Sequence, residues 1–341
     1  NYDIELVANP GMAFKVVDFA QDTDGYRWWH TEDDYWMRED VVNEAESCWL
    51  VDNAPAWLHQ AQERIADGAA LMEGAGDGTW HESIPYQNFL LTYSLMFMDS
   101  LRRNVDVDIF PHTYLRNYSD WRLYNLLSNG DFILTYGNFD WDWFNGFMPH
   151  HLMRFVANEY DDGYAEWVAR EMRYSTSEDE LTFGAPWLVL EFIYYDASIA
   201  PKPPTDKALS QRFPDLDAVI WRTSWERDAM VFGLKSGALG GRNAYEQFIA
   251  QQFPCSYPYT QSACQLNVGH DHMDANTIYL FRDGQWLIPE SVSSGSSATS
   301  NHNTIQIDQR SQYRPSFDYY DERPELFENT DAVITAHVDL P

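Results

Sequence analysis

The amino-acid sequence changes from a helical to a strand-like pattern at Pro201-Lys202-Pro203-Pro204. Before this break, apolar residues recur at three- and four-residue spacing over 54–72, 89–103 and 148–172, which predicts amphipathic helices. After it, short runs rich in β-branched and aromatic residues alternate with Gly, Asp and Ser, which predicts strands joined by tight turns. We therefore expect an α+β protein with domains at 1–204 and 205–341. The expected strands are 218–222, 229–234, 277–281, 286–288 and 304–307.

The dipeptide Asp283-Gly284 separates two of these strands and is a strong signal for a two-residue hairpin turn. If the first strand reaches back to His270, then His270 and His272 share one face, because strand side chains alternate. Strict pairing across the turn would put Glu290 on the opposite face from His272. Pro289 cannot donate a ladder hydrogen bond, so we expect the chain to leave the ladder just before Glu290.

The segment 269–304 concentrates residue types that bind cations and move protons. Neutral imidazoles and carboxylates are ligands that a zinc-like cation needs, and a further histidine beside them suits proton transfer. A solvated surface hairpin is the plain alternative, but this density of ligand types favours an active site. The residues concerned are His270, Asp271, His272, Asp274, Asn276, Glu290, Asn301, His302 and Asn303.

The charge of the chain is strongly negative, with 53 acidic against 22 basic residues and a formal net charge of −31. Such a surface repels nucleic acid and anionic membranes, so we expect neither as a partner. An anionic substrate would need local positive charge, for which Lys235 and Arg242 are the candidates. The 14 Trp, 21 Tyr and 19 Phe suit stacking on sugar rings, although a large aromatic core accounts for most of them.

No apolar run approaches the roughly 18 residues of a membrane span, and no stretch has the pattern of a signal peptide. Cys255 and Cys264 could close a short disulfide and leave Cys48 free. Such a disulfide fits an oxidising compartment. We expect a secreted or periplasmic protein on this ground.

Several motifs together resemble the heparinase II/III-like polysaccharide lyases and the related dermatan sulfate (glucuronyl) epimerase. The segment 77–86 is similar to the family's helix with the catalytic tyrosine, and His30 lies 56 residues before Tyr86, where the family keeps its toroid histidine. The segment 137–144 is similar to one that lines the cleft. The segment 235–242 resembles the epimerase's Lys-Ser-Gly and Gly-Gly-Arg, and 269–304 resembles the sandwich histidine, metal ligands and His-Asn-Thr signature.

The resemblance implies an incomplete (α/α) toroid followed by an antiparallel β-sandwich, which would be truncated in this chain, with the site between them. It implies catalytic roles for His30, Tyr86 and His270. Substrate contacts would come from Asn138, Trp141, Lys235 and Arg242. One divalent cation, zinc first and Mn or Ca as alternatives, would be held by His272, Glu290 and His302.

The implied reaction is β-elimination in a uronic-acid polymer of the alginate or glycosaminoglycan type. The C5 proton of a uronic acid is weakly acidic, so the enzyme must neutralise the C6 carboxylate, remove the proton and protonate the leaving O4. His30 and Arg242 would neutralise the carboxylate, while Tyr86 and His270 would transfer protons from either side of the ring. The cation would be mainly architectural and would fix the loop that carries His270.

Three other functions remain open on the sequence. Glu290 stands where many of the lyases have Asp and the epimerase has Glu, which favours a uronyl C5-epimerase as the first alternative. Trp29 also departs from the lyases, which usually carry Asn before the toroid histidine. A metal-dependent glycan hydrolase would use the same ligands with a base such as Asp274. A non-catalytic carbohydrate-binding protein would use the aromatic residues but leave the His/Glu cluster unexplained.

Overall fold

The computed structural model describes two compact units, 1–64 and 65–341. Within them, the described residues are 16–21, 23, 25–31, 36–38, 49–127, 133–134, 136–138, 149–172, 185–249, 270–290, 297–309 and 311–312. The first unit contains a three-stranded antiparallel sheet of β1 (Val16–Gln21), β2 (Arg27–Thr31) and β3 (Trp36–Arg38). This sheet differs from the helical pattern expected before the Pro-rich break. Its strands are rich in Val and aromatic residues, which favour a pleated surface.

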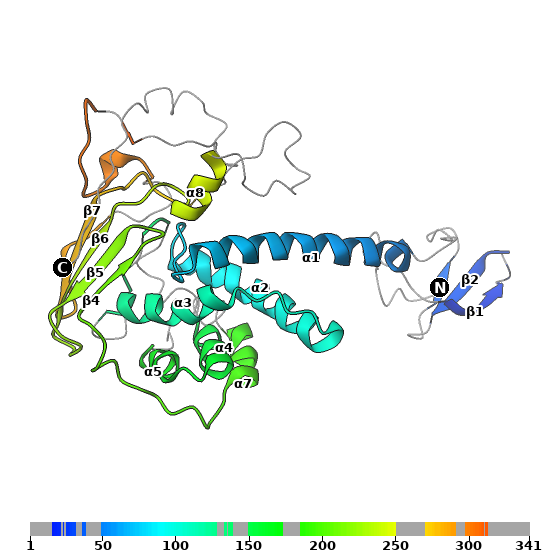
Figure 1. Ribbon diagram of the computed structural model, residues 1–341. Coiled ribbons are helices and arrows are strands. Elements are labelled where there is room, and N and C mark those ends of the chain that lie inside the picture. The colour runs from blue at the N-terminus through cyan, green and yellow to red at the C-terminus, as the bar shows by residue number, and fades with distance from the viewer. Residues whose placement is uncertain are drawn as a thin grey trace. The chain divides into compact units, whose positions relative to one another are not determined.

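Most of the described α-helices precede the Pro-rich break, as expected (Figure 1). The predicted helices over 54–72 and 89–103 fall within α1 (Trp49–Ala75) and α2 (Ile84–Val105), and α3 (His112–Asn125) follows. The expected helix over 148–172 is instead split into α4 (His150–Tyr160) and α5 (Gly163–Glu171). The split lies at Asp161, which has a left-handed φ of 52°, and Asp162, whose side chain caps α5. A short η2 (Ala185–Trp187) leads into α7 (Leu188–Tyr194).

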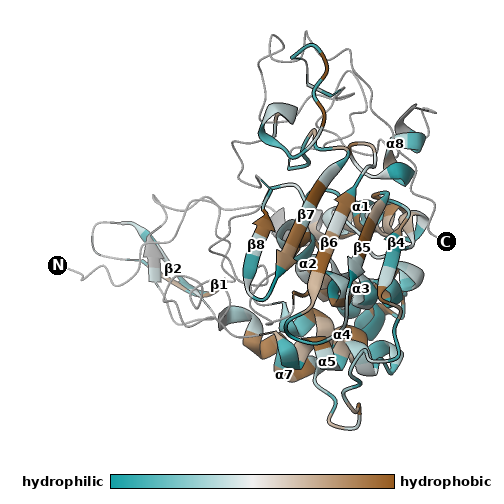
Figure 2. Cartoon of the chain, turned by 90° about the vertical axis from the view of Figure 1, so that its left-hand side faces the viewer, coloured by the Kyte–Doolittle hydropathy of each residue, from teal (hydrophilic) through white to brown (hydrophobic). Residues whose placement is uncertain are grey.

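The strands after the break form one five-stranded antiparallel sheet in sequence order (Figure 2). Its members are β4 (Ser210–Phe213), β5 (Ala218–Arg222), β6 (Met230–Lys235), β7 (Thr277–Arg282) and β8 (Gln285–Ile288). Four of the five predicted strands are therefore confirmed. The expected strand at 304–307 is wrong, and a helix that was not expected, α8 (Arg242–Ile249), follows β6. A 3₁₀ turn, η3 (Thr299–Asn301), precedes His302.

The helices α2 to α5 lie on the same side of this sheet in both views (Figures 1 and 2), and α3 packs against that face of it. Ile220, Gly233 and Tyr279 are register neighbours on this face, and Ile220 and Tyr279 are fully buried. Trp221 points to the other face and is 42% exposed. The ring of Trp121 in α3 meets Phe213 of β4 edge-on at 4.8 Å. The α+β class is thus confirmed, whereas the toroid and the sandwich remain predictions.

The hairpin between β7 and β8 has the predicted turn. Asp283 and Gly284 both have positive φ angles, 48° and 76°, as a two-residue turn of this kind requires. The pairing register shifts between Leu280 and Phe281, and β8 ends at Ile288, directly before Pro289. The expectation that the chain leaves the ladder before Glu290 is therefore confirmed.

Strand β7 begins only at Thr277, so His270 and His272 lie in the loop before it. The expectation that both histidines share a strand face is wrong. Asn276 has a φ of 68°, which an extended strand does not allow, and so the ladder cannot run back to them. Among the described helices, none is long and apolar enough to cross a membrane.

Gly233 in β6 allows a close approach between the sheet and the segment 133–138. A Cβ at this position would lie 2.5 Å from Leu134 Cδ1 and 3.0 Å from Tyr136 Oη. We expect Gly233→Ala to lower the free energy of unfolding by about 1–3 kcal/mol, because overpacking forces neighbouring side chains to move. Urea unfolding followed by circular dichroism measures this change.

Gly68→Ala is the matched control for Gly233→Ala. No atom lies within 4 Å of a Cβ built on Gly68, and alanine favours the interior of a helix such as α1 by roughly 0.5–1 kcal/mol. This variant should keep or raise the stability of the protein. Equal losses in the two variants would contradict the packing described here.

Candidate active site

The first turn of α2 presents Tyr86. Ser83 precedes the helix, and its Oγ accepts a hydrogen bond from the backbone N–H of Tyr86 at 3.3 Å. Pro85 lies in the first turn, where its missing N–H needs no partner. The ring of Tyr86 stacks on the imidazole of His270, with 3.8 Å between ring centroids and 13° between planes. Two of the three predicted catalytic residues are therefore in direct contact.

Asn138 fixes the imidazole of His270. Its Nδ2 lies 2.7 Å from His270 Nδ1, and its Oδ1 lies 2.6 Å from His272 Nε2. Its backbone N–H also donates to His270 O at 2.8 Å. Since an amide nitrogen donates and an amide oxygen accepts, His270 Nδ1 is an acceptor and His272 Nε2 is a donor. The amide predicted to contact substrate therefore holds two histidines in place.

Gly137 allows three chain segments to meet beside this amide. It has a φ of 79°, and a Cβ would lie 2.2 Å from Glu82 O and 2.7 Å from His270 O. Only glycine fits both the left-handed backbone and the contact with two carbonyl groups. This residue therefore positions the start of α2, the segment around Asn138 and the His270 loop against one another.

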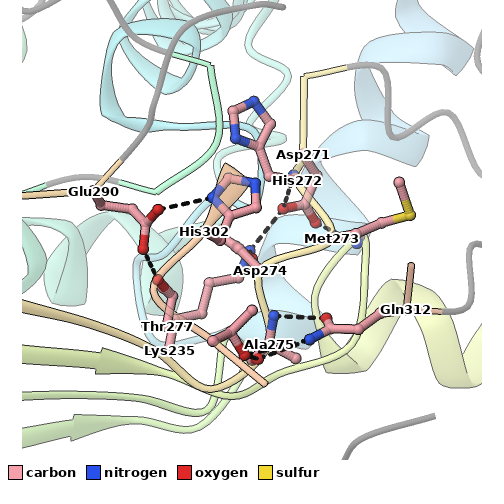
Figure 3. Close-up of polar contacts among 12 residues, drawn as sticks. Lys235, Asp271, His272, Met273, Asp274, Ala275, Thr277, Glu290, His302 and Gln312 are labelled. Atoms are coloured by element: carbon pink, nitrogen blue, oxygen red, sulfur yellow. Dashed lines mark hydrogen bonds and ion pairs between the residues drawn. The ribbon is translucent and has the colours of Figure 1, made fainter. Parts of the chain in front are cut away.

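Lys235 ties the His270 loop to the sheet (Figure 3). Its Nζ donates to Asp271 Oδ1 at 2.7 Å and to Asp274 Oδ1 at 2.8 Å, and all three side chains are at most 2% exposed. Burial alone would lower the pKa of Lys235, but the two carboxylates outweigh burial and raise this pKa above its ordinary value. In this buried ion pair Lys235 stabilises the loop, and its ammonium group is not available for the predicted contact with substrate.

Asp274 is buried and accepts a hydrogen bond from Lys235 Nζ. Its carboxylate is therefore not available as the general base of a hydrolase. The loop is closed on its other side by Gln312. The side chain of Gln312 accepts from Ala275 N at 2.8 Å and donates to Ala275 O at 2.9 Å, as a neighbouring strand would. The 270–276 loop is thus held from both sides.

The three predicted metal ligands lie together (Figure 3). His302 Nδ1 donates to Glu290 Oε1 at 2.9 Å, and the rings of His302 and His272 are 5.0 Å apart. Glu290 Oε2 also accepts from Asn303 N at 2.9 Å and from the hydroxyl of Thr277. With Nδ1 donating, a neutral His302 presents a lone pair on Nε2, which is buried and has no hydrogen-bond partner among the described residues.

This donor set, two imidazoles and a carboxylate, suits a zinc-like cation. In the part of the chain that the structure describes, no three His, Cys, Asp or Glu side chains are arranged around one point as metal ligands. The hydrogen bond from His302 Nδ1 to Glu290 Oε1 occupies a carboxylate oxygen that a cation would otherwise bind. The cation therefore stays a prediction, supported by the buried Nε2 of His302.

Arg242 opens α8 beside a group of carboxylates. Its guanidinium pairs with Asp217, and its side chain is 37% exposed. Asp215 Oδ1 accepts from Asn243 N at 2.7 Å and so caps the helix, while Asp215 N donates to Asp77 Oδ2 at 2.7 Å. Burial raises the pKa of Asp215 to about 7, against the lowering effect of the Asn243 N–H. Arg242 keeps partial access to solvent, as a substrate contact requires.

Two predicted site residues lie outside the described part of the second unit, which contains this cluster. His30 lies in β2 of the first unit, where its ring stacks on Trp36 at 4.4 Å. Its meeting with Tyr86 and His270 stays a prediction. Trp141 falls outside the described residues, as do Cys48, Cys255 and Cys264.

The sequence contained a signal for the role of Lys235. In β6, Val231, Gly233 and Lys235 alternate with Phe232 and Leu234, so Lys235 follows the buried face. A lysine on such a face needs carboxylate partners, and Asp271 and Asp274 are the last two acidic residues before the next strand. The bridging role of Asn138 has no such local signal.

No family model matches the chain. Among solved structures, the chain is similar to heparinase III, with a TM-score of 0.44 and 12% identity over 70% of this chain and 33% of that protein. It is also similar to the heparan sulfate lyase HepC from Pedobacter heparinus, with a TM-score of 0.39 and 16% identity over 69% of this chain and 31% of that protein. The chain thus spans about a third of the length of these two proteins.

Replacing Lys235 should destabilise the protein strongly. Lys235→Met leaves the carboxylates of Asp271 and Asp274 buried without their cation, and breaking a buried pair in this way costs about 3–5 kcal/mol. Lys202→Met is the matched control, because Lys202 and Asp206 pair at 2.7 Å with side chains that are 52% and 55% exposed. An exposed pair contributes about 0.2–1 kcal/mol. Urea unfolding of both variants measures the difference, and similar losses would contradict the role of Lys235.

Proposed function

We propose that the chain is a polysaccharide lyase that cleaves a uronic-acid-containing anionic polysaccharide by β-elimination. The contact between Tyr86 and His270 carries this proposal. A phenol and an imidazole in contact form a pair that can both accept and donate protons. Asn138 orients the imidazole, and the ion-paired loop holds it against the first turn of α2.

The reaction needs one proton removed and one proton delivered. The base takes the C5 proton, and the electrons of the C5–H bond form a double bond between C4 and C5. The bond from C4 to O4 breaks, and O4 receives a proton as it leaves. A positioned base and acid accelerate such steps by roughly a hundredfold to ten-thousandfold each.

The ring pair changes the expected placement of the two groups. The ring centroids of Tyr86 and His270 are 3.8 Å apart, whereas a sugar ring between them would require about twice the ordinary contact distance of 3.5–4.0 Å. The sugar therefore meets both groups from one side, and not between them as the sequence suggested. Proton removal from C5 and proton delivery to O4 then occur on the same face of the sugar.

The hydrogen bond from Asn138 supports different roles for the two members of the pair. With His270 Nδ1 accepting from the amide, the neutral imidazole carries its proton on Nε2 and can donate it to O4. Tyr86 Oη is then the group that takes the C5 proton. Arg242, which is partly exposed, and His30 are the proposed partners of the substrate carboxylate.

We further propose one divalent cation, zinc first, at His272, Glu290 and His302. When bound, the cation would neutralise Glu290 and fix the rings of the two histidines. The side chain of Asn138 hydrogen-bonds to both His272 and His270, so fixing the ring of His272 also restrains the ring of His270. Its contribution to the reaction is therefore positional.

Removal of the cation should lower the melting temperature. Elemental analysis of the purified protein should show about one cation per chain, and a chelator should lower the midpoint of thermal unfolding. His302→Ala should abolish the stoichiometric cation and the effect of the chelator. His59→Ala should change neither, because His59 is 73% exposed and bonds only to Glu63 among the described residues. A cation-free protein with unchanged melting on chelation would exclude this site.

The lyase activity is tested by the near-ultraviolet absorbance of the unsaturated uronate that β-elimination creates. Heparan sulfate, dermatan sulfate, chondroitin, alginate and ulvan are the substrates to screen. On the best substrate, Tyr86→Phe should lower turnover at least about a hundredfold and change KM little, because the hydroxyl acts in the transition state. Tyr93→Phe, in the same helix and 58% exposed, is the control and should keep full activity.

The same assays separate the other functions. A C5-epimerase incorporates solvent deuterium at C5 and gives no unsaturated product. A hydrolase produces reducing ends without the absorbance, and a binding protein produces neither signal. Full turnover of the Tyr86→Phe variant would contradict the assignment of the base.

A further inference from the structure

A second candidate site lies at the other end of the sheet from Lys235. It is a cavity of about 180 Å³ between the end of α3, the helix α5 and the turn that joins β5 to β6. The six residues of β6 separate this turn from Lys235, a span of about 17–20 Å at the usual rise of a strand. None of its lining residues belongs to the cluster around Tyr86.

The cavity contains a buried guanidinium without a carboxylate partner. Arg222 is 3% exposed, and its Nη2 donates to Tyr124 O at 2.8 Å and to Leu126 O at 3.1 Å, at the C-terminal end of α3. Among the described residues, its buried Nε has no hydrogen-bond partner and no carboxylate pairs with its guanidinium. Burial lowers the pKa of Arg222 to about 10, so the group stays charged at neutral pH.

An unsatisfied buried donor costs free energy, and the cost is larger for a charged group. The carbonyl groups at the end of α3 offset only part of it, through the negative end of the helix dipole. An anionic acceptor that enters the cavity would complete the hydrogen bonding of Arg222 and pair directly with its charge, as neither Glu171 nor Glu226 in the described lining does. The site therefore favours a ligand with a carboxylate.

The other walls suit a sugar ring. Trp167 and Trp225 line the cavity, and the guanidinium carbon of Arg222 lies 4.0 Å from the ring centroid of Trp225. Indole faces pack well on the C–H faces of a pyranose. The carboxylates of Glu171 and Glu226, which also line the cavity, can accept hydrogen bonds from sugar hydroxyls. The cavity has room for several waters, and a single sugar ring is a ligand of comparable size.

We propose that this cavity binds a single uronate residue, with the sugar ring against Trp167 and Trp225 and the carboxylate on Arg222. It is a saccharide contact separate from the reacting cluster. The inference concerns binding alone and holds whether or not the Tyr86 cluster cleaves the polymer.

Indole N–H signals of the full chain labelled with ¹⁵N-tryptophan provide the test. The probes are D-glucuronate, D-glucose and acetate, each titrated separately. Trp167→Phe and Trp225→Phe assign the two signals of the cavity, and Trp80 reports on the neighbourhood of Tyr86. With glucuronate, we expect the Trp167 and Trp225 signals to shift and saturate, at concentrations at least about tenfold below those needed for glucose or acetate.

Two variants sharpen the test. Trp167→Ala should weaken glucuronate binding at the Trp225 signal at least tenfold, while circular dichroism stays unchanged. Trp221→Ala is the matched control, because Trp221 is 42% exposed, neighbours Arg222 in β5 and does not line the cavity. It should leave the titration unchanged. Shifts confined to Trp80, equal responses to acetate or glucose, or no shift at Trp167 and Trp225 would each overturn the proposal.

Discussion

The ammonium group of Lys235 is the charge on which the arrangement of the site depends. It lies at the end of β6 and binds two carboxylates of the loop that carries His270. The second oxygen of Asp271 accepts from Gly240 N at 2.8 Å, so the same carboxylate also fixes the turn before α8. One buried cation therefore joins the sheet, the histidine loop and the helix that begins with Arg242. Because desolvated charges are stable only when fully paired, these parts are held together as one unit.

The elements that could be predicted are those whose cause is local. Asp283-Gly284 set the turn between β7 and β8, since only residues that tolerate positive φ fit it. Pro289 ended β8 because it has no N–H to donate. Ser83 and Pro85 set the start of α2 in the same local way, although the apolar pattern predicted this helix only from residue 89. In each case, a few adjacent residues decide the backbone conformation.

What could not be predicted depends on contacts between distant segments. The amide of Asn138 joins His270 and His272, which sequence reasoning placed together through strand alternation instead. The segment 304–307 has the composition of a strand, but the backbone N–H of Asn303 and the hydroxyl of Thr304 bond to Glu290 and Ala275. The stacking of Tyr86 on His270 likewise follows from packing that brings α2 to the loop. Pattern in the sequence carries no information on such pairings.

The strand order β4-β5-β6-β7-β8 has a consequence for the order of folding. Each strand pairs with its neighbour in sequence, and β4 to β6 and β7 to β8 are joined by short turns, so these hairpins close with little loss of chain entropy. Tyr86, Asn138, His270 and His302 come instead from segments spread over more than 200 residues. Contacts of such separation form late, because their loops must close first. The contact between Tyr86 and His270 therefore forms only after both the helices and the sheet are in place, and it reports the final step of folding rather than the formation of secondary structure.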